Sequence, residues 1–387
     1  MATLLPQGER AVTRIESGAI GIAYPPVSGI TSGLMTEPGC QSGYPRVSPR
    51  GARRVRASIQ AFVMSTILCL TPAVAHADHT TLPERCTAVS FPVTGLGTLA
   101  GTMCMPARPT STVMVMMPGS GYNHTYWDFP YDPQTYSFRR AMNIAGYATL
   151  IVDRFGNGAS SRPPSVQLTA TGSVRALHEL VGAVRQGLPG FQPFSKVITG
   201  GHSLSSGIAV IEASTYHDVD GVLLTGFSHS LDIVGATEVI STYYPAEQDP
   251  KFAGQGYDTG YVTTRPGTRQ GNYYGPGAAD PEVVAVDEAT KEVFSLTEYP
   301  DGLTSTLPPT TNNINVPVMV VNGSADRLCL RTCENTETLA AAEAPYFSPA
   351  AKLRTFVLPG SGHSVNLAPN TAEYQAAVRD WLKSTFE

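Results

Sequence analysis

The chain has 387 residues, of which 42% are hydrophobic and 15% are charged, and it carries a formal net charge of −5 at pH 7. This composition suits one large globular domain with an insertion, or two small domains, and it excludes an intrinsically disordered chain. The acidic balance argues against nucleic acid or an anionic membrane as a partner.

The first 77 residues resemble a leader rather than part of a globular domain. Residues 1–56 are rich in Gly, Pro, Ser and Arg, and they end in a basic stretch that precedes an apolar run at 57–70. Small residues follow, which is the pattern of a secretory signal peptide with cleavage after Ala75 or Ala77. A membrane anchor is the alternative, but the run is shorter than the roughly 20 residues of a spanning helix. We therefore expect a secreted (extracellular or periplasmic) protein without a stable membrane anchor.

Cleavage would leave 19 basic and 28 acidic residues, a formal net charge of −9, and four cysteines. Cys86 and Cys104 bracket a hairpin-like pair of β-rich runs, and Cys329 and Cys333 lie four apart in one predicted loop. The local pairing, Cys86 with Cys104 and Cys329 with Cys333, agrees with an oxidising compartment. Zinc binding is the alternative, but no Cys/His group has zinc-site spacing, so we expect two disulfides and no metal.

Beyond the leader, short apolar runs alternate with helical patterns, which is typical of a mainly parallel sheet flanked by helices. Strands are predicted at 87–93, 98–103, 113–117, 148–152, 196–199, 221–225, 316–321 and 353–358. Helices are predicted at 136–145, 171–185, 207–216, 335–342 and 371–386. Residues 231–315 break the alternation and show only weak helical patterns near 233–243 and 281–294, so we interpret them as an insertion.

Residues 201–205 (Gly-His-Ser-Leu-Ser) closely follow the predicted strand at 196–199 and precede a helical pattern. A tight strand-to-helix turn of small residues is typical of a nucleophile elbow, which exposes a serine hydroxyl, here that of Ser203, beside a helix N-terminus. The motif usually ends in glycine, and Ser205 takes that place; serine is small enough for the turn.

A serine nucleophile needs a base that is itself oriented by an acid. Asp326 follows the predicted strand at 316–321, and His363 follows the next predicted strand. The order Ser, Asp, His is the one expected of an α/β-hydrolase. Asp232 is the alternative acid, because it follows the strand at 221–225. His202 is the alternative base.

Acyl transfer also needs hydrogen-bond donors for the developing oxyanion. The strand at 113–117 runs into a Gly-rich turn that could present the amide of Ser120 (or of Gly121), and the amide of Leu204 would be the second donor. Three further side chains are expected to line the substrate site: Tyr122, His124 and His202.

On these motifs the chain resembles the α/β-hydrolase superfamily over about residues 86–387. Residues 118–120 (Pro-Gly-Ser) stand where many members have His-Gly-x, and residues 153–160 resemble the Asp-x-x-Gly-x-Gly-x-Ser segment that follows the fourth strand. The resemblance implies an eight-stranded, mostly parallel sheet flanked by helices, with a lid inserted after the sixth strand. A serine at position 203 disfavours the superfamily's epoxide hydrolases and dehalogenases, which use an aspartate there.

The implied division is a leader and signal peptide (1–77), the first part of the hydrolase core (78–230), a lid (231–315) and the second part of the core (316–387). The lid is rich in tyrosine. Aromatic side chains combine apolar contact with a polar tip. These tyrosines either cover a hydrophobic, ring-containing substrate or only pack the lid on the body.

Together these features predict a secreted serine esterase that cleaves the carboxylic ester, or lactone, of a small hydrophobic molecule without a cofactor. Amide substrates are not excluded by the motifs. A hydroxynitrile-lyase type of enzyme could use the same three residues, but it would need a substrate-binding lysine or a similar cation, and the only lysines of the lid are Lys251 and Lys291. A non-catalytic binding protein on the same fold is the other alternative.

Overall fold

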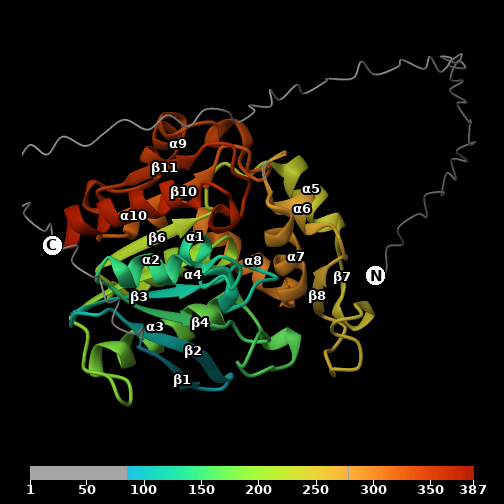
Figure 1. Ribbon diagram of the computed structural model, residues 1–387, viewed down its shortest axis with the longest axis horizontal. Coiled ribbons are helices and arrows are strands. Elements are labelled where there is room, and N and C mark those ends of the chain that lie inside the picture. The colour runs from blue at the N-terminus through green and yellow to red at the C-terminus, as the bar shows by residue number, and fades with distance from the viewer. Residues whose placement is uncertain (1–84, 278) are drawn as a thin grey trace, which may run out of the picture. The chain divides into compact units, whose positions relative to one another are not determined.

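The computed structural model describes residues 85–277 and 279–387 of the chain (Figure 1). The predicted leader, its signal peptide and the cleavage sites at Ala75 and Ala77 lie outside the described residues. No helix in the described part of the chain combines the length and the apolar character needed to cross a membrane.

An eight-stranded sheet with the strand order β1-β2-β4-β3-β5-β6-β10-β11 organises the fold. Its strands are β1 (Arg85–Val93), β2 (Gly97–Met105), β3 (Thr112–Met117), β4 (Ala148–Val152), β5 (Lys196–His202), β6 (Gly221–Thr225), β10 (Val318–Gly323) and β11 (Arg354–Leu358). β2 pairs antiparallel with β1 and β4, whereas the other neighbours are parallel. The predicted fold class, a mostly parallel eight-stranded sheet flanked by helices, is confirmed.

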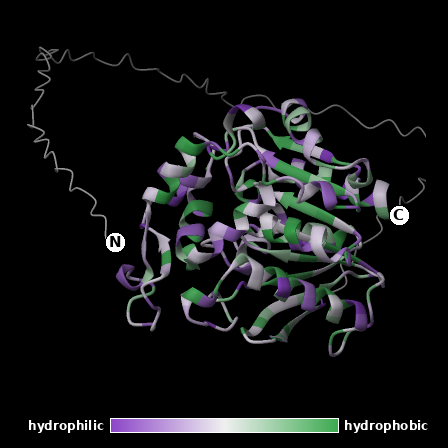
Figure 2. Cartoon of the chain, turned by 180° about the vertical axis from the view of Figure 1, so that it is seen from behind, coloured by the Kyte–Doolittle hydropathy of each residue, from purple (hydrophilic) through white to green (hydrophobic). Residues whose placement is uncertain are grey.

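Helices cover both faces of this sheet, so its central strands are buried throughout. The main helices are α2 (Phe138–Ile144), α3 (Ala170–Gln186), α4 (Leu204–Tyr216), α9 (Thr336–Glu343) and α10 (Thr371–Phe386), and the short α1 (Pro133–Tyr136) precedes α2. Along β3, Val113 and Val115 belong to the core that includes α3 and α4, whereas Met114 and Met116 belong to the core that includes α2 and α10. This period of two follows from the alternation of side chains along a strand. Figure 2 shows the sheet as the most hydrophobic part of the fold.

The sequence predictions hold best for the regular elements. Three predicted ranges (148–152, 221–225 and 371–386) coincide with β4, β6 and α10. The predicted strand at 196–199 is too short, because Gly200 and Gly201 continue β5 by pairing with β3 and β6. The predicted helix at 136–145 is split into α1 and α2, because Ser137 has an extended backbone and caps α2 by accepting from the Arg140 amide.

The inserted segment, residues 231–315, lies between β6 and β10. It contains α5 (Ile233–Ser241), α6 (Arg269–Tyr273), α7 (Pro281–Thr290) and α8 (Tyr299–Gly302), with β7 (Tyr243–Pro245), β8 (Tyr261–Thr264) and β9 (Phe294–Ser295). The three strands form a small antiparallel sheet in the order β7-β8-β9. The two weak helical patterns correspond to α5 and α7, whereas the small sheet was not predicted. In Figure 1 these elements, coloured yellow to orange, gather beside the main sheet.

A buried ion pair fastens the inserted segment to the core. Arg154, which follows β4, pairs with Glu298 of the inserted segment, and each side chain is only 3% exposed. The Nε and Nη1 atoms of Arg154 have no hydrogen-bond partner among the described residues. Glu298 therefore supplies the charge that compensates a buried guanidinium.

We predict that Glu298→Ala destabilises the protein strongly, because it leaves Arg154 buried without its counter-charge. The expected loss is about 3–5 kcal/mol in the free energy of unfolding, measured by urea denaturation. The matched control is Glu247→Ala, which removes an exposed glutamate of the same segment and should cost less than about 0.5 kcal/mol. Equal losses in the two variants would contradict this account of how the segment is held.

Candidate active site

Ser203 forms the whole connection between β5, which ends at His202, and α4, which begins at Leu204. Its backbone has φ 55° and ψ −122°, a conformation that residues other than glycine rarely adopt. This is the strained strand-to-helix turn expected of a nucleophile elbow. The turn puts Ser203 at the carboxyl end of a central strand and at the N-terminus of a helix, where the helix dipole favours negative charge.

Two glycines give the elbow the space that it needs. A Cβ at Gly201 would lie 2.2 Å from the carbonyl carbon of Ser205. A Cβ at Gly119 would lie 2.8 Å from the His202 ring and 3.2 Å from the Ser203 Cβ. The turn after β3 therefore passes directly beside Ser203, which is possible only because position 119 has no side chain.

Asp326 and His363 come together in the loops that follow β10 and β11. His363 Nδ1 lies 2.8 Å from Asp326 Oδ2, and both side chains are almost completely buried. The other carboxylate oxygen, Oδ1, accepts a hydrogen bond from the Leu328 amide. An ionised carboxylate can only accept hydrogen bonds, so His363 Nδ1 must donate the proton in the bond to Asp326. The other ring nitrogen, Nε2, then carries no proton and can accept one.

Close backbone packing holds these two loops. The Ala325 amide donates to the Ser361 carbonyl at 2.8 Å. A Cβ at Gly323 would lie 2.2 Å from the Gly362 carbonyl oxygen. The geometry of the Asp326–His363 pair is therefore set by the backbone as well as by the hydrogen bond between the side chains.

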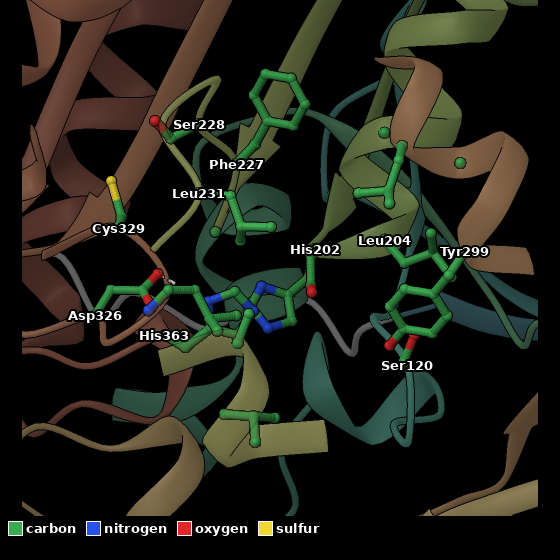
Figure 3. Close-up of a pocket in the computed structure, with 18 of the residues that line it drawn as sticks. Ser120, His202, Leu204, Phe227, Ser228, Leu231, Tyr299, Asp326, Cys329 and His363 are labelled. Atoms are coloured by element: carbon green, nitrogen blue, oxygen red, sulfur yellow. Dashed lines mark hydrogen bonds and ion pairs between the residues drawn. The ribbon is translucent and has the colours of Figure 1, made fainter. Parts of the chain in front are cut away.

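Ser203, Asp326 and His363 line the same pocket. His363 Nε2 is buried there and has no hydrogen-bond partner among the described residues. In the view of Figure 3, Asp326, His363 and His202 follow one another toward Ser120 and Leu204. The pocket thus holds a serine on a strained turn and an imidazole whose free nitrogen can accept a proton.

The alternative acid and base occupy other environments. Asp232 Oδ1 accepts from the Gly235 amide at 2.7 Å and caps α5, and Asp232 does not line the pocket. His202 is fully buried, stacks on Tyr126 with ring centroids 4.3 Å apart, and lies 4.7 Å from the His363 ring. Burial lowers the pKa of His202 well below its usual value, so its ring is neutral at pH 7. Asp326, and not Asp232, is the acid in contact with His363.

The turn after β3, which the sequence predicts to supply oxyanion donors, has the geometry of a type II turn. Tyr122 donates its amide to the Gly119 carbonyl at 3.2 Å, and Gly121 has φ +72°, which is the conformation that a type II turn requires at its third residue. Ser120, the second residue of this turn, lines the pocket. Leu204 lines it as well, and its amide, at the first position of α4, has no acceptor within the helix.

The two departures from the family pattern contact each other. The Ser205 hydroxyl, where the elbow motif has glycine, donates to the carbonyl of Pro118, where many members have histidine, at 2.6 Å. The Ser205 side chain is completely buried. This hydrogen bond ties the first turn of α4 to the turn that carries Ser120, so the substitution at position 205 has a structural role of its own.

The three residues expected to line the substrate site have different positions. Tyr122 and His202 line the pocket. His124 does not, and instead both its amide and its Nδ1 lie 2.8 Å from Asp153 Oδ1. This hydrogen bond raises the pKa of His124. Asp153 begins the 153–160 segment, so that segment anchors the loop that carries His124.

Arg269 of α6 was not predicted, and no motif in the sequence marks it. Its guanidinium is completely buried over the Tyr122 ring, 4.1 Å from the ring centroid. It pairs with Asp287 at 2.7 Å and donates to the Gly121 carbonyl at 3.1 Å. Arg269 therefore connects the inserted segment to the turn that carries Ser120.

The pocket encloses about 220 Å³, and most of its wall is apolar. The inserted segment contributes a large part of this apolar surface, with Leu231, Ala236, Val239, Ile240, Tyr243, Tyr273, Tyr299 and Leu303. None of the described residues that line the pocket is a lysine or an arginine. The aliphatic residues of α5 were not predicted as pocket residues, because only a weak helical pattern marks them.

The tyrosines of the inserted segment divide between the two predicted roles. Tyr243, Tyr273 and Tyr299 line the pocket, and burial raises the pKa of each, so all three present neutral hydroxyls. The other four tyrosines do not line the pocket, and their hydroxyls donate hydrogen bonds elsewhere. Within the segment, Tyr244 donates to Asp249 and Tyr274 donates to Asp287. Toward the core, Tyr257 donates to the Gly156 carbonyl and Tyr261 donates to the Pro163 carbonyl.

The structure contains both disulfides in the predicted pairing, Cys86–Cys104 and Cys329–Cys333. The first joins directly opposed residues of β1 and β2. The second closes the loop after Asp326, where Cys329 lines the pocket and donates its amide to the Asp326 carbonyl at 3.1 Å. We therefore expect the second disulfide to stiffen the loop that carries Asp326.

Comparison with known proteins agrees with this geometry. The model of the alpha/beta hydrolase family matches residues 114–376, more than half of the chain. The chain belongs to this family. A search by sequence among curated proteins found no match.

Solved structures share the fold at low sequence identity. An esterase from Thermogutta terrifontis is 17% identical with a TM-score of 0.53, and the match covers 78% of this chain and 100% of that one. A soluble variant of monoglyceride lipase from Saccharomyces cerevisiae is 13% identical with a TM-score of 0.55, covering 77% and 94%. The α/β hydrolase GrgF from Penicillium sp. sh18 is 15% identical with a TM-score of 0.52, covering 77% and 97%.

We predict that Ser205→Ala lowers kcat for a 4-nitrophenyl ester about fivefold with little change in KM. The lost hydrogen bond to Pro118, worth on the order of 1 kcal/mol, positions the turn that carries Ser120. Ser214→Ala is the matched control, because Ser214 of the same helix also donates to a backbone carbonyl, that of Ile211. If both variants keep the wild-type kcat, the Ser205 hydrogen bond does not position the turn.

We predict that replacing Cys329 and Cys333 by serine lowers both the thermal stability and kcat, the latter about tenfold, because misplacing the acid loop misaligns the imidazole. Replacing Cys86 and Cys104 by serine should lower the stability alone, since that disulfide lies outside the pocket lining. Thermal unfolding and ester hydrolysis measure the two effects. Activity and stability unchanged by loss of the Cys329–Cys333 bond would refute its proposed role.

Proposed function

We propose that the protein is an exported serine hydrolase that cleaves the carboxylic ester of a small hydrophobic molecule. The observation that carries this proposal is the buried hydrogen bond of 2.8 Å between His363 Nδ1 and Asp326 Oδ2. It leaves His363 Nε2 without a partner among the described residues, in the pocket that Ser203 also lines. An oriented base beside a serine on a nucleophile elbow is the arrangement of an activated nucleophile.

In the proposed mechanism, the Ser203 hydroxyl attacks the ester carbonyl while His363 Nε2 takes its proton. Asp326 stabilises the imidazolium that forms and keeps the ring in the required orientation. The amides of Ser120 and Leu204 bind the developing oxyanion. His363 then protonates the leaving alkoxide, and it activates a water molecule that hydrolyses the acyl-enzyme.

The pocket supports a small, uncharged and largely apolar substrate. Its volume of about 220 Å³ and its wall of aliphatic and tyrosine side chains suit such a molecule. The absence of lysine and arginine from the described lining residues disfavours an anionic substrate. The Thermogutta terrifontis esterase and the yeast monoglyceride lipase are ester hydrolases on the same fold. Lactones fall within the same chemistry.

A hydroxynitrile-lyase type of reaction has less support, because both lysines of the inserted segment are engaged away from the pocket. Lys291 Nζ pairs with Asp249 at 2.6 Å and donates to the Thr264 carbonyl. Lys251 Nζ donates to the Ala289 carbonyl at 2.9 Å. Neither lysine lines the pocket. A non-catalytic binding role also has less support, because serine, histidine and aspartate are all present in one pocket.

Export is part of the proposal, on two grounds. The first is the signal-like pattern of the leader. The second is the pair of disulfides, which form and persist in oxidising compartments.

We predict that Ser203→Ala abolishes hydrolysis of 4-nitrophenyl butyrate, with a loss of at least about 10³-fold in kcat, while the protein stays folded. Circular dichroism and thermal unfolding check the fold. Ser305→Ala is the matched control, because it removes another serine hydroxyl from the pocket wall, and it should retain most of the activity. Normal ester hydrolysis by the Ser203→Ala variant would refute the assignment.

A further inference from the structure

A second cluster of ionisable side chains lies outside the pocket. His178 of α3, Glu212 of α4 and Asp218, which follows α4, place their ligand atoms within 4.8 Å of one another. His178 Nδ1 is 2.7 Å from Asp218 Oδ2. None of the three residues lines the pocket, so the cluster is separate from the proposed catalytic machinery.

Glu212 is the unexplained member of this cluster. Its side chain is completely buried, with 0% exposed. Neither of its carboxylate oxygens, nor Asp218 Oδ1, accepts a hydrogen bond from an N–H group or an alcohol of the described residues. The Glu212 side chain interacts instead with the neighbouring Asp218 carboxyl. Buried carboxylates are normally satisfied by donors, because desolvation of an unpaired charge is costly.

Arg185, which contacts the backbone of Asp218, does not fill this role. Arg185 donates its Nε to the backbone carbonyl of Asp218 at 2.8 Å and its Nη2 to the carboxylate of Asp220 at 2.5 Å. Its charge is thus directed to Asp220 rather than to the carboxyl groups of the cluster. The carboxyl groups of Glu212 and Asp218 therefore lie beside the His178 imidazole, and the Arg185 guanidinium forms no hydrogen bond to either carboxyl group.

The cluster is also open to an ion from solvent. The side chains of His178 and Asp218 are 38% and 24% exposed, respectively. The Tyr216 ring stacks on the His178 ring, with centroids 3.7 Å apart and an interplanar angle of 7°, and so restrains its orientation. The arrangement combines two solvent-facing ligands with one ligand that is fixed in the interior.

We propose that His178, Glu212 and Asp218 form a binding site for one divalent transition-metal ion of the zinc type. Zn²⁺ accepts both imidazole nitrogen and carboxylate oxygen as ligands, and where the protein supplies three ligands a water molecule takes the fourth position. Ca²⁺ and Mg²⁺ prefer sites composed entirely of oxygen, with more ligands than this cluster offers. The ion satisfies both carboxylates at once and joins α3 to α4.

The expected consequence is stabilisation and not catalysis. Glu212 lies nine residues along α4 from Ser203, about 13 Å at 1.5 Å per residue. An ion at that distance takes no part in acyl transfer. It holds the helix that carries the elbow against α3, and it stabilises the folded chain by mass action. The proposal does not depend on the proposed hydrolase function.

The test is calorimetric titration of the full chain with ZnCl₂ after treatment with a chelator, together with thermal unfolding. We expect one Zn²⁺ per chain and a rise in Tm of several degrees, whereas CaCl₂ at the same concentration changes neither. Glu212→Gln and His178→Gln should each weaken Zn²⁺ binding at least tenfold and remove the rise in Tm. His178 is partly exposed, so its variant tests the site even if the buried substitution impairs folding.

His217→Asn is the matched control. His217 is an exposed neighbour with a left-handed backbone (φ 53°), which asparagine tolerates, and it is not part of the cluster. Its variant should bind Zn²⁺ as the wild type does. The proposal is overturned if the wild type shows no saturable binding, if the His178 and Glu212 variants bind normally, or if the His217 variant loses binding to the same extent.

Discussion

The candidate active site depends on one hydrogen bond, between His363 Nδ1 and Asp326 Oδ2. It joins the loops after β10 and β11, it is shielded from water, and it leaves only Nε2 of the imidazole free. In the strand order, β10 and β6 separate β11 from β5, so the His363 side chain must cross the ends of two strands to reach Ser203. Gly226, at the end of β6, makes this crossing possible, because a Cβ there would lie 2.8 Å from the His363 ring. The position of His363 thus depends both on the lack of a side chain at Gly226 and on the hydrogen bond to Asp326.

The second part of the site, the elbow at Ser203 and the turn after β3, depends on close packing of these two backbone segments. The sheet puts β3 next to β5, so the turn after β3 runs beside the elbow, and glycines at 119 and 201 allow that approach. Ser205 and Arg269 then hold the turn from two sides, the first through the Pro118 carbonyl and the second through the Gly121 carbonyl. A strained backbone such as that of Ser203 persists only where the surrounding structure holds it, and these neighbours provide such packing.

The sequence predicted what is encoded locally. The ranges of β4, β6 and α10 follow from continuous apolar runs and helical spacing. Ser203, Asp326 and His363 could be chosen as candidates because each follows a predicted strand of a parallel sheet. The small sheet β7-β8-β9 was missed because its strands are short and pair within a segment without periodicity. Arg269 and the Ser205–Pro118 bond were missed because they join residues that are far apart in the chain. The tyrosines of the inserted segment could not be divided between pocket and packing for the same reason.

The most direct test compares the rates at which a fluorophosphonate probe labels the wild type and two aspartate variants, with the adduct located by mass spectrometry. The account predicts labelling at Ser203, with a rate about 10³- to 10⁴-fold lower in Asp326→Asn and within about twofold of the wild type in Asp232→Asn, since Asp232 only caps α5. Labelling at another residue, or equal rates in the two variants, would contradict the claim that Asp326 orients His363 to activate Ser203.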